Sequence, residues 1–389
     1  MERFGRRISM AFLNIFKILG WLIFIFAESV PTLFIARLVH GIGIGGLFIN
    51  ALIIGEYSHP TRRGYYSAIK KICGALGSLT VHGMSLIWSW RQIAAVSLLP
   101  PFLSLVVCLF WPESPSHLAL KGRFAECEKS FTWLRGTSFQ SRMELNELIA
   151  TQKENRDKIQ RSFFEKIRDR TFLKSFLLVS LLSIIIDTCG RFYFVAYVIQ
   201  IMVEITGDRS VATFCSLGSD CLSIIALLSS CYVIRTLKRR TVLLVFGGFS
   251  VLLMFLIGFI KLFKSATWLI PAVLLLHNFV IYLSVIPVCY TMFGELIPLE
   301  FRAIGGCSCG IVIATFYAVT LKITPILMEH TGVQGTYAIY GVSILMCLAI
   351  LYYILPETKD KTLQQIENEL SGAKRDEEIK PMFEENKVP

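Results

Sequence analysis

Three ionisable side chains stand out because they lie within apolar stretches. Asp187 and Arg191 are four residues apart in one such stretch, and Asp220 lies in the next. A charge at the centre of a bilayer costs about 3 kcal/mol or more, so such groups usually carry function. Residues four apart share one face of a helix, so Asp187 and Arg191 either form a structural ion pair or line a polar cavity. Asp187 or Asp220 could also carry a proton.

Other candidate polar groups are weaker. Lys71 lies close enough to the start of its apolar segment to reach the surface. Three histidines, His40, His82 and His277, are scattered among the apolar segments, where a lone histidine is more often a hydrogen-bond partner between helices than a proton relay.

The sequence carries no sign of metal or nucleotide chemistry. It has no HExxH pair and no GxxxxGK[ST] loop, and its eleven cysteines form no CxxC pair. We therefore expect a protein that is not an enzyme, that holds no metal or cofactor, and that is not driven directly by ATP.

The amino-acid composition indicates whether these ionisable side chains belong to a soluble protein or to a membrane protein. Of 389 residues, 54% are apolar and only 17% are charged, whereas about a quarter of an ordinary soluble protein is charged. This excludes a disordered chain and a single soluble globule, and it predicts an all-α polytopic membrane protein whose main partner is the lipid bilayer. The net charge of +11 fits basic loops facing the cytoplasm, so no nucleic-acid partner is expected.

About ten stretches have the roughly 20 mostly apolar residues that a transmembrane helix needs. The third is the weakest, because Lys70, Lys71 and His82 interrupt it. The predicted spans are 8–27, 32–55, 66–87, 91–111, 173–202, 210–234, 241–261, 267–292, 304–327 and 335–355.

The connections between these spans alternate between basic and short. If the basic set is cytoplasmic, both termini also face the cytoplasm. The predicted organisation is an N-terminal helical bundle over 1–111, a cytoplasmic linker with intracellular helices over 112–171, a six-helix bundle over 172–355 and a cytoplasmic tail over 356–389.

Three elements recur in the same order in both halves of the chain. ERFGRR (2–7) matches RTLKRR (235–240), EYSHPTRRG (56–64) matches ELIPLEFRAIG (295–305), and PESPSHLALKGR (112–123) matches PETKDKTLQQIE (356–367). An ordered repeat of this kind predicts a duplicated bundle with a pseudo-two-fold axis along the membrane normal, as in major facilitator transporters.

These residues resemble the sugar porter family of the major facilitator superfamily. PESPSHLALKGR and PETKDKTLQQIE are among its most specific signatures, RLVHGIGIGG (37–46) looks like its fourth helix, and KSFTWLRG (129–136) looks like its arthropod facilitated trehalose transporter branch. The resemblance covers nearly the whole chain. Because the family has twelve helices and this chain opens on the loop after the second, its ten spans correspond to family helices three to twelve.

The paired basic and acidic loops predict a charge network at the cytoplasmic gate. Several weak ion pairs together can bias a two-state equilibrium, although each is worth little alone. In the second half Lys238 replaces the family's glycine and Arg235 its acidic residue, which is expected to weaken that network. The residues assigned to this network are Arg6, Arg7, Glu56, Arg63, Glu113, Arg239, Arg240, Glu295, Arg302 and Glu357.

The resemblance also implies a central solute cavity whose contacts are rewritten here. Ile186 and Asp187 stand where the family has two adjacent glutamines that face sugar hydroxyls, and Lys71 stands at another family glutamine. Glycines 41, 43, 45 and 46 are expected to allow close helix packing. The candidate cavity residues are Lys71, Asp187, Arg191, Tyr197, Asp220, Ser223, Phe279 and Pro287.

The predicted function is transport of a small polar solute, a sugar such as trehalose or a hexose, by alternating access in the plasma membrane. Uniport and symport with a proton or another ion both remain open. The alternative is a non-transporting sugar-porter relative that acts as a solute sensor or as a partner of a full-length paralogue.

Overall fold

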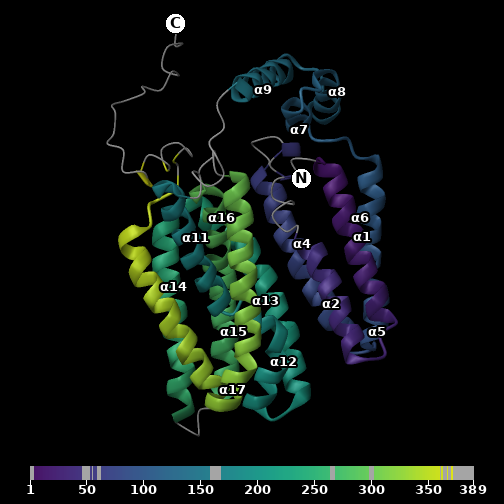
Figure 1. Ribbon diagram of the computed structural model, residues 1–389. Helices are drawn as coiled ribbons and strands as arrows, with labels where there is room; N and C mark the ends of the chain where they lie inside the picture. Colours follow the sequence, from purple (N-terminus) through teal and green to yellow (C-terminus); the bar gives the residue numbers. More distant parts are fainter. Residues whose placement is uncertain are drawn as a thin grey trace, which may run out of the picture. The chain divides into compact units, whose positions relative to one another are not determined.

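The protein is all-helical in the computed structural model, with no strand among the residues that it describes (Figure 1). The chain divides into two compact units, considered separately below: 1–161 with 197–232 and 265–283, and 162–196 with 233–264 and 284–389. The described residues are 4–45, 53–54, 56–58, 63–157, 168–262, 268–297, 302–359, 361, 366 and 369–370.

In the first unit, α1 (Arg6–Ile25) packs along α2 (Val30–Ile44) and along α6 (Leu99–Phe110), as Figure 1 shows. A Cβ on Gly43 of α2 would lie 3.1 Å from the backbone oxygen of Leu13 on α1. Asn14 of α1 donates to Ser104 Oγ of α6 at 2.8 Å. A small residue and a buried polar contact therefore set how closely these helices approach.

The expected glycine face is only partly an interface. A Cβ on Gly43 would meet α1, whereas a Cβ on Gly41 would meet nothing within 4 Å. Gly46 lies outside the described residues. Among the described glycines of this helix, close packing against α1 thus depends on Gly43.

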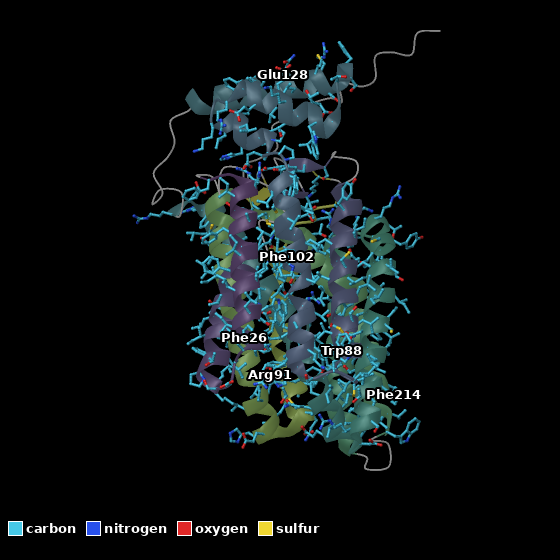
Figure 2. The ribbon with its side chains drawn as sticks, turned by 90° about the vertical axis from the view of Figure 1, so that its right-hand side faces the viewer. Phe26, Trp88, Arg91, Phe102, Glu128 and Phe214 are labelled. Carbon is cyan, nitrogen blue, oxygen red and sulfur yellow. The ribbon has the colours of Figure 1, made fainter. Side chains whose placement is uncertain are left out.

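The first unit also contains α4 (Arg63–Met84) and α5 (Trp90–Ser97), which precedes α6. Arg91 of α5 donates to the backbone oxygen of Ala27 at 2.9 Å, which ties the loop after α1 to α5. Large apolar side chains such as Phe102 project outward from this unit (Figure 2), which suits contact with lipid better than contact with water.

Three further helices lie at the opposite end of α1 and α6 from Arg91 (Figures 1 and 2). They are α7 (Pro115–Leu120), α8 (Phe124–Arg135) and α9 (Phe139–Asp157). They share a small apolar core formed by Leu118, Ala119, Cys127, Phe131 and Leu145. These residues between α6 and α11 are therefore largely helical in the part that the structure describes.

In the second unit, α17 (Arg302–Ile354) packs along α11 (Arg170–Thr188) and α14 (Arg239–Leu262). The α17 helix is interrupted at Gly332, whose φ of 68° and ψ of 177° are not helical. Because that conformation strains any other residue, Gly332 marks the junction between the two separately predicted spans 304–327 and 335–355. Buried Leu182, Met254 and Met292 contribute to the core of this unit.

Three further helices have residues in both units: α12 (Tyr193–Thr206), α13 (Arg209–Thr236), and a long element that runs from α15 (Ile270–Val280) through a π-helical segment (Ile281–Val285) into α16 (Ile286–Leu296). The π-helical segment precedes Pro287, which has no N–H to donate to the preceding turn, so the backbone adjusts at this point.

The helices fall where the apolar stretches predicted them. Seven helical segments are long and apolar enough to cross a membrane, and Val30–Ile44 is a shorter apolar helix within the described residues. Arg63–Met84 forms a helix but is not among the seven, because Lys70, Lys71 and His82 lower its hydropathy. The weakest predicted span therefore forms a helix that is less apolar than the seven.

Candidate functional site

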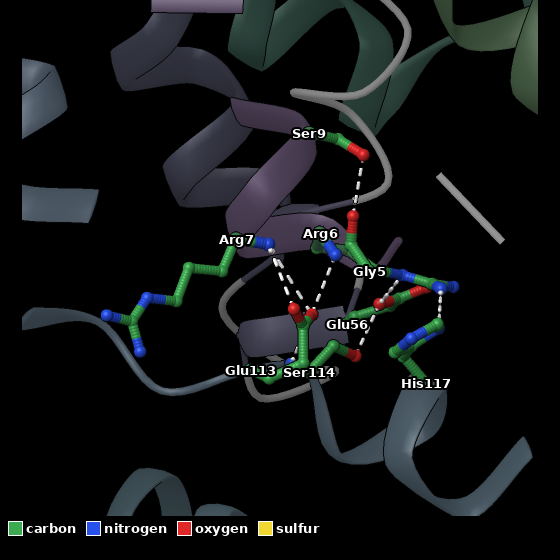
Figure 3. Close-up of polar contacts among 8 residues, drawn as sticks. All are labelled: Gly5, Arg6, Arg7, Ser9, Glu56, Glu113, Ser114 and His117. Atoms are coloured by element: carbon green, nitrogen blue, oxygen red, sulfur yellow. Dashed lines mark hydrogen bonds and ion pairs between the residues drawn. The ribbon is translucent and has the colours of Figure 1, made fainter. Parts of the chain in front are cut away.

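One cluster of charged side chains lies at the start of α1 and is shown in Figure 3. We call Arg6, Glu56, Glu113, Ser114 and His117 the first charge network. The Arg6 guanidinium donates to both carboxylate oxygens of Glu56, with Nη2–Oε1 at 2.6 Å and Nε–Oε2 at 2.8 Å. Such two-bond pairs fix geometry better than single contacts.

The remaining donors of the first charge network are also paired. Arg6 Nη1 lies 2.9 Å from Nδ1 of His117. Because a guanidinium can only donate, Nδ1 accepts and the imidazole is neutral with its proton on Nε2. Ser114 Oγ donates to the second oxygen of Glu56 at 2.5 Å.

Glu113 caps the amino end of α1. Its carboxylate accepts from the backbone N–H groups of Arg6 at 2.7 Å and Arg7 at 3.2 Å, and from its neighbour Ser114 at 2.9 Å. These are helix-terminal donors that no backbone oxygen satisfies, and a carboxylate there also meets the positive end of the helix dipole. Gly5 makes the approach possible, because its φ is 90° and a Cβ on it would lie 2.3 Å from the Glu113 carboxylate.

The first charge network is largely shielded from solvent. The side chains of Arg6 and Glu56 are 13% and 16% exposed, so their attraction is stronger than that of a surface pair. Burial, and then the positive charge of Arg6, lowers the pKa of His117. Burial, followed by the charges of Glu113 and Glu56, raises the pKa of nearby Tyr57, whose hydroxyl donates to the backbone oxygen of Pro112 at 3.0 Å.

The second unit contains an equivalent arrangement, which we call the second charge network: Arg239, Glu295, Glu357 and Thr358. The Arg239 guanidinium pairs with Glu295 and also reaches Thr358 Oγ1 at 3.3 Å. Glu357 accepts from the backbone N–H groups of Arg239 at 3.1 Å and Arg240 at 3.2 Å.

The two networks correspond in their arginines and glutamates. Arg6 and Arg239 each bind a loop glutamate, and Glu113 and Glu357 each cap the helix that the arginine begins. Arg7 and Arg240 occupy equivalent positions too: each donates to a backbone oxygen of the span that ends just before the capping glutamate, Leu109 in one unit and Tyr352 in the other, at 2.5 Å in both. The second network therefore forms despite Lys238 and Arg235.

The structure thus gathers eight of the ten residues assigned to the gate into two groups. The side chains of Arg63 and Arg302 lie outside those described. Sequence reasoning missed Ser114, His117 and Thr358; the hydroxyl residue that follows the glutamate in both PES and PET was the available signal for two of them.

Of the two alternatives for Asp187 and Arg191, an ion pair on one helix face is not found. Helix α11 ends at Thr188, and Gly190 has a φ of 105°, so Arg191 does not continue the same helical turn. Asp187 is 1% exposed and neither of its carboxylate oxygens has a hydrogen-bond partner. A buried carboxylate without a partner is costly, so Asp187 remains a candidate site for a cation or a solute.

The other candidate cavity residues occupy several helices. Asp220 and Ser223 are buried on α13, where Asn278 of α15 donates to Ser223 Oγ at 2.8 Å and Ser78 of α4 donates to Asp220. The structure therefore brings Asp220 and Ser223 into one polar region of the first unit. Lys71 on α4, Tyr197 on α12 and Phe279 on α15 are half-buried in that unit, whereas Asp187, Arg191 and the buried Pro287 belong to the other unit.

The described residues include no group of three or more potential metal ligands. The sequence Gly306–Gly310 matches GxSxG, but it lies inside helix α17, whereas a catalytic nucleophile of that pattern needs a sharp turn between a strand and a helix.

Comparison with known proteins identifies the family of this chain. A family model described as sugar (and other) transporter matches residues 1–370. The chain belongs to this sugar transporter family. The expected resemblance is therefore confirmed, and with it a multi-pass membrane transporter fold rather than an enzyme.

Relatives of this sugar transporter family member are distant but extend over nearly its whole length. It is 25% identical to sugar transporter ERD6-like 6 of Arabidopsis thaliana over 94% of this chain and 77% of the relative. It is 23% identical to the facilitated trehalose transporter Tret1 of Apis mellifera ligustica over 96% and 76%. It is 25% identical to an arabinose-proton symporter of Bacillus subtilis over 94% and 81%.

Solved structures show the same fold for this family member. The proton:xylose symporter XylE bound to 6-bromo-6-deoxy-D-glucose superposes with a TM-score of 0.75, covering 95% of this chain and 84% of that one at 18% identity. A partially occluded inward-open form of XylE from E. coli gives 0.76, with 93% and 83% covered at 17% identity. The predicted major-facilitator bundle is thus confirmed.

Proposed function

We propose that this chain moves a small neutral sugar, trehalose or a hexose, across the plasma membrane by alternating access. The observation that carries this proposal is the match to the sugar transporter family over residues 1–370, together with a charge network built twice from the same groups. The relatives named as trehalose and arabinose transporters support a sugar as the solute. No observation favours the non-transporting alternative.

The proposal includes an orientation and a domain organisation. Both termini and both charge networks face the cytoplasm, because the basic loops lie there. The partial bundle 1–111, the linker 112–171, the six-helix bundle 172–355 and the tail 356–389 are its parts.

The two charge networks act at the cytoplasmic gate. Each joins a basic helix start to a loop glutamate and to the segment that follows the last helix of its half. Several half-buried charged contacts of this kind keep the helix ends and loops of each half in one conformation. A fixed shape lets one half close against the other and part from it without rearranging internally.

The solute contacts come from the candidate cavity residues. Serine and amide groups such as Ser223 and Asn278 can both donate to and accept from sugar hydroxyls. Asp187 replaces the uncharged amide that the family places at its position, so specificity is expected to differ from that of the family's hexose transporters. Coupling to a proton is also part of the proposal, supported by the arabinose-proton symporter among the relatives.

Counterflow in proteoliposomes tests the proposal directly. Purified full chain is reconstituted with unlabelled trehalose, glucose or arabinose inside, and entry of the same labelled sugar is measured. Transport gives an overshoot that empty liposomes do not show. If none of these three sugars exchanges while the protein is correctly inserted, sugar transport is contradicted and binding of the same sugars without flux would favour a sensor.

A further inference from the structure

An acid–base contact joins α4 and α13 at a place that the charge networks do not use. His82 Nδ1 of α4 lies 2.5 Å from Oδ2 of Asp220 on α13, and Ser78, one turn earlier on α4, donates from Oγ to Oδ1 at 3.1 Å. An ionised carboxylate only accepts, so Nδ1 carries a proton, and in the neutral form of the ring Nε2 holds the lone pair. The side chains of His82 and Asp220 are 21% and 10% exposed.

The neighbourhood of this contact is polar but mostly uncharged. Asn278 of α15 donates to Ser219 Oγ and to Ser223 Oγ of α13, both at 2.8 Å. Along the helices, Lys71 and Arg209 share the faces of His82 and Asp220 but stand eleven residues away, about 16 Å, and His277 is the titratable residue of α15. The remaining titratable groups with described side chains on α4 and α13 are Tyr66, Lys70, Cys73, Cys215, Cys221, Cys231, Tyr232 and Arg235.

We propose that the His82–Asp220 pair is the proton-binding site of a sugar–proton symport cycle. The inference rests on the proposed transport function and names where the coupling proton is held. A proton from water adds to the lone pair of His82 Nε2 and gives an imidazolium, while the Nδ1–H bond to Asp220 is kept. Release reverses this step: the same proton leaves Nε2, and no other bond changes.

Proton binding changes the charge of the pair from −1 to zero. A net charge is costly inside a bilayer and a neutral ion pair is much less so, hence the loaded pair is compatible with a closed, water-free state and the empty pair is not. Asp220 also lies in the same polar region as Ser223, so the charge changes beside groups proposed to contact the sugar. Binding of the proton therefore changes the affinity for the solute, and binding of the solute changes the affinity for the proton, because the two sites lie close enough to interact electrostatically.

The test measures protons and sugar in two vesicle samples from one reconstitution of the full chain. One sample holds a pH-sensitive dye and no sugar, and trehalose, glucose or arabinose is added outside; the other is preloaded with the same sugar, and its counterflow is recorded. We expect sugar-driven acidification for the unaltered chain. The ratio of acidification to counterflow is expected to fall at least about tenfold in His82→Gln. The glutamine amide keeps a hydrogen bond to Asp220 but has no nitrogen that binds a proton.

Ser78→Ala is the matched control, because it removes a hydrogen bond to the same carboxylate and no titratable group. Its ratio is expected to stay near that of the unaltered chain. The proposal is overturned if His82→Gln keeps the full ratio, or if the unaltered chain exchanges sugar without acidification. The second outcome leaves transport intact, so it separates failure of the proton site from failure of the proposed function.

A second measurement needs no transported solute. Infrared difference spectra of the purified chain between acidic and neutral buffer report protonation of imidazole and carboxyl groups. We expect an imidazole signal that is lost in His82→Gln and kept in Ser78→Ala. Identical spectra for the unaltered chain and His82→Gln would contradict a proton site here, even if no sugar is found.

Discussion

At the scale of single residues, the capping of α1 by Glu113 depends on a glycine. Gly5 combines a φ of 90° with a carboxylate 2.3 Å from where a Cβ would be. Only glycine adopts that backbone at little cost and leaves that space. The glycine in the short FGRR segment is therefore explained by its contact with a glutamate more than a hundred residues away.

Gly5→Ala is accordingly expected to destabilise the first unit by about 1–3 kcal/mol, through backbone strain and displacement of Glu113. Thermal unfolding of the detergent-solubilised protein measures this. Gly74→Ala on α4 is the control, because a Cβ there meets nothing within 4 Å. Equal melting temperatures for the two variants would show that Glu113 does not depend on Gly5.

His117 gives the first charge network a dependence on pH. Burial and Arg6 lower its pKa in the folded protein below the ordinary value of 6.5. The unfolded chain therefore binds more protons in the window below that value, and stability falls as the pH drops from 6.5 through the lowered pKa. We expect the melting temperature to decline more steeply between about pH 7 and pH 5 in the unaltered chain than in His117→Gln. Parallel declines would mean that the pKa of His117 is the same in the folded and unfolded chain, so that burial and Arg6 do not lower it.

At the scale of helices, the approach of α1 and α2 depends on Gly43. Its Cβ would lie 2.6 Å from Lys17 Cγ and 3.1 Å from the Leu13 backbone oxygen; the lysine side chain can move, but the backbone oxygen cannot move without shifting α1. Forcing atoms into such a contact typically costs about 1–3 kcal/mol. Gly43→Ala should thus lower the melting temperature.

Gly41→Ala is the control on the same helix, because a Cβ at Gly41 meets nothing within 4 Å. Alanine is favoured over glycine inside a helix, so this variant is expected to be neutral or slightly more stable. A loss of stability in Gly41→Ala as large as that in Gly43→Ala would show that helix packing is not the cause.

The positions of the helices could be predicted from the sequence, because each is a long apolar stretch bounded by charged or short polar segments. The ends of α11 and α17 were harder, since Gly190 and Gly332 interrupt helices inside apolar stretches that have no other boundary. This is why a pairing of Asp187 with Arg191 on one helix face stayed open as an alternative in the sequence. The contact of His82 with Asp220 joins residues 138 apart in sequence, and no local pattern specifies such a contact.

At the scale of the whole molecule, the repeat in the sequence predicted which charged residues gather. It could do so because the same three elements recur in the same order, so each half supplies its own arginine and glutamates. It could not predict the neutral partners Ser114, His117 and Thr358, because only their hydrogen bonds distinguish them from other loop residues.

The duplication predicts that both networks are needed for transport. Glu295→Arg or Arg239→Glu leaves a like-charge pair in a half-buried site, and we expect either change to reduce counterflow at least about tenfold. Exchanging both residues restores opposite charges, so the double variant should recover part of the rate. No recovery, with normal amounts of folded protein, would show that Thr358 requires arginine at position 239 specifically.

Each charge network lies entirely within one unit. All partners described above for Arg6 and for Arg239 belong to the same unit as the arginine. If the halves rock as rigid bodies, the ion pairs and hydrogen bonds of each network stay intact, and each network acts as an internal brace that stabilises its own half. The energy that separates the two end states of the cycle must then come from elsewhere. A double-mutant cycle across either brace should give the same coupling energy in protein trapped open to either side of the membrane.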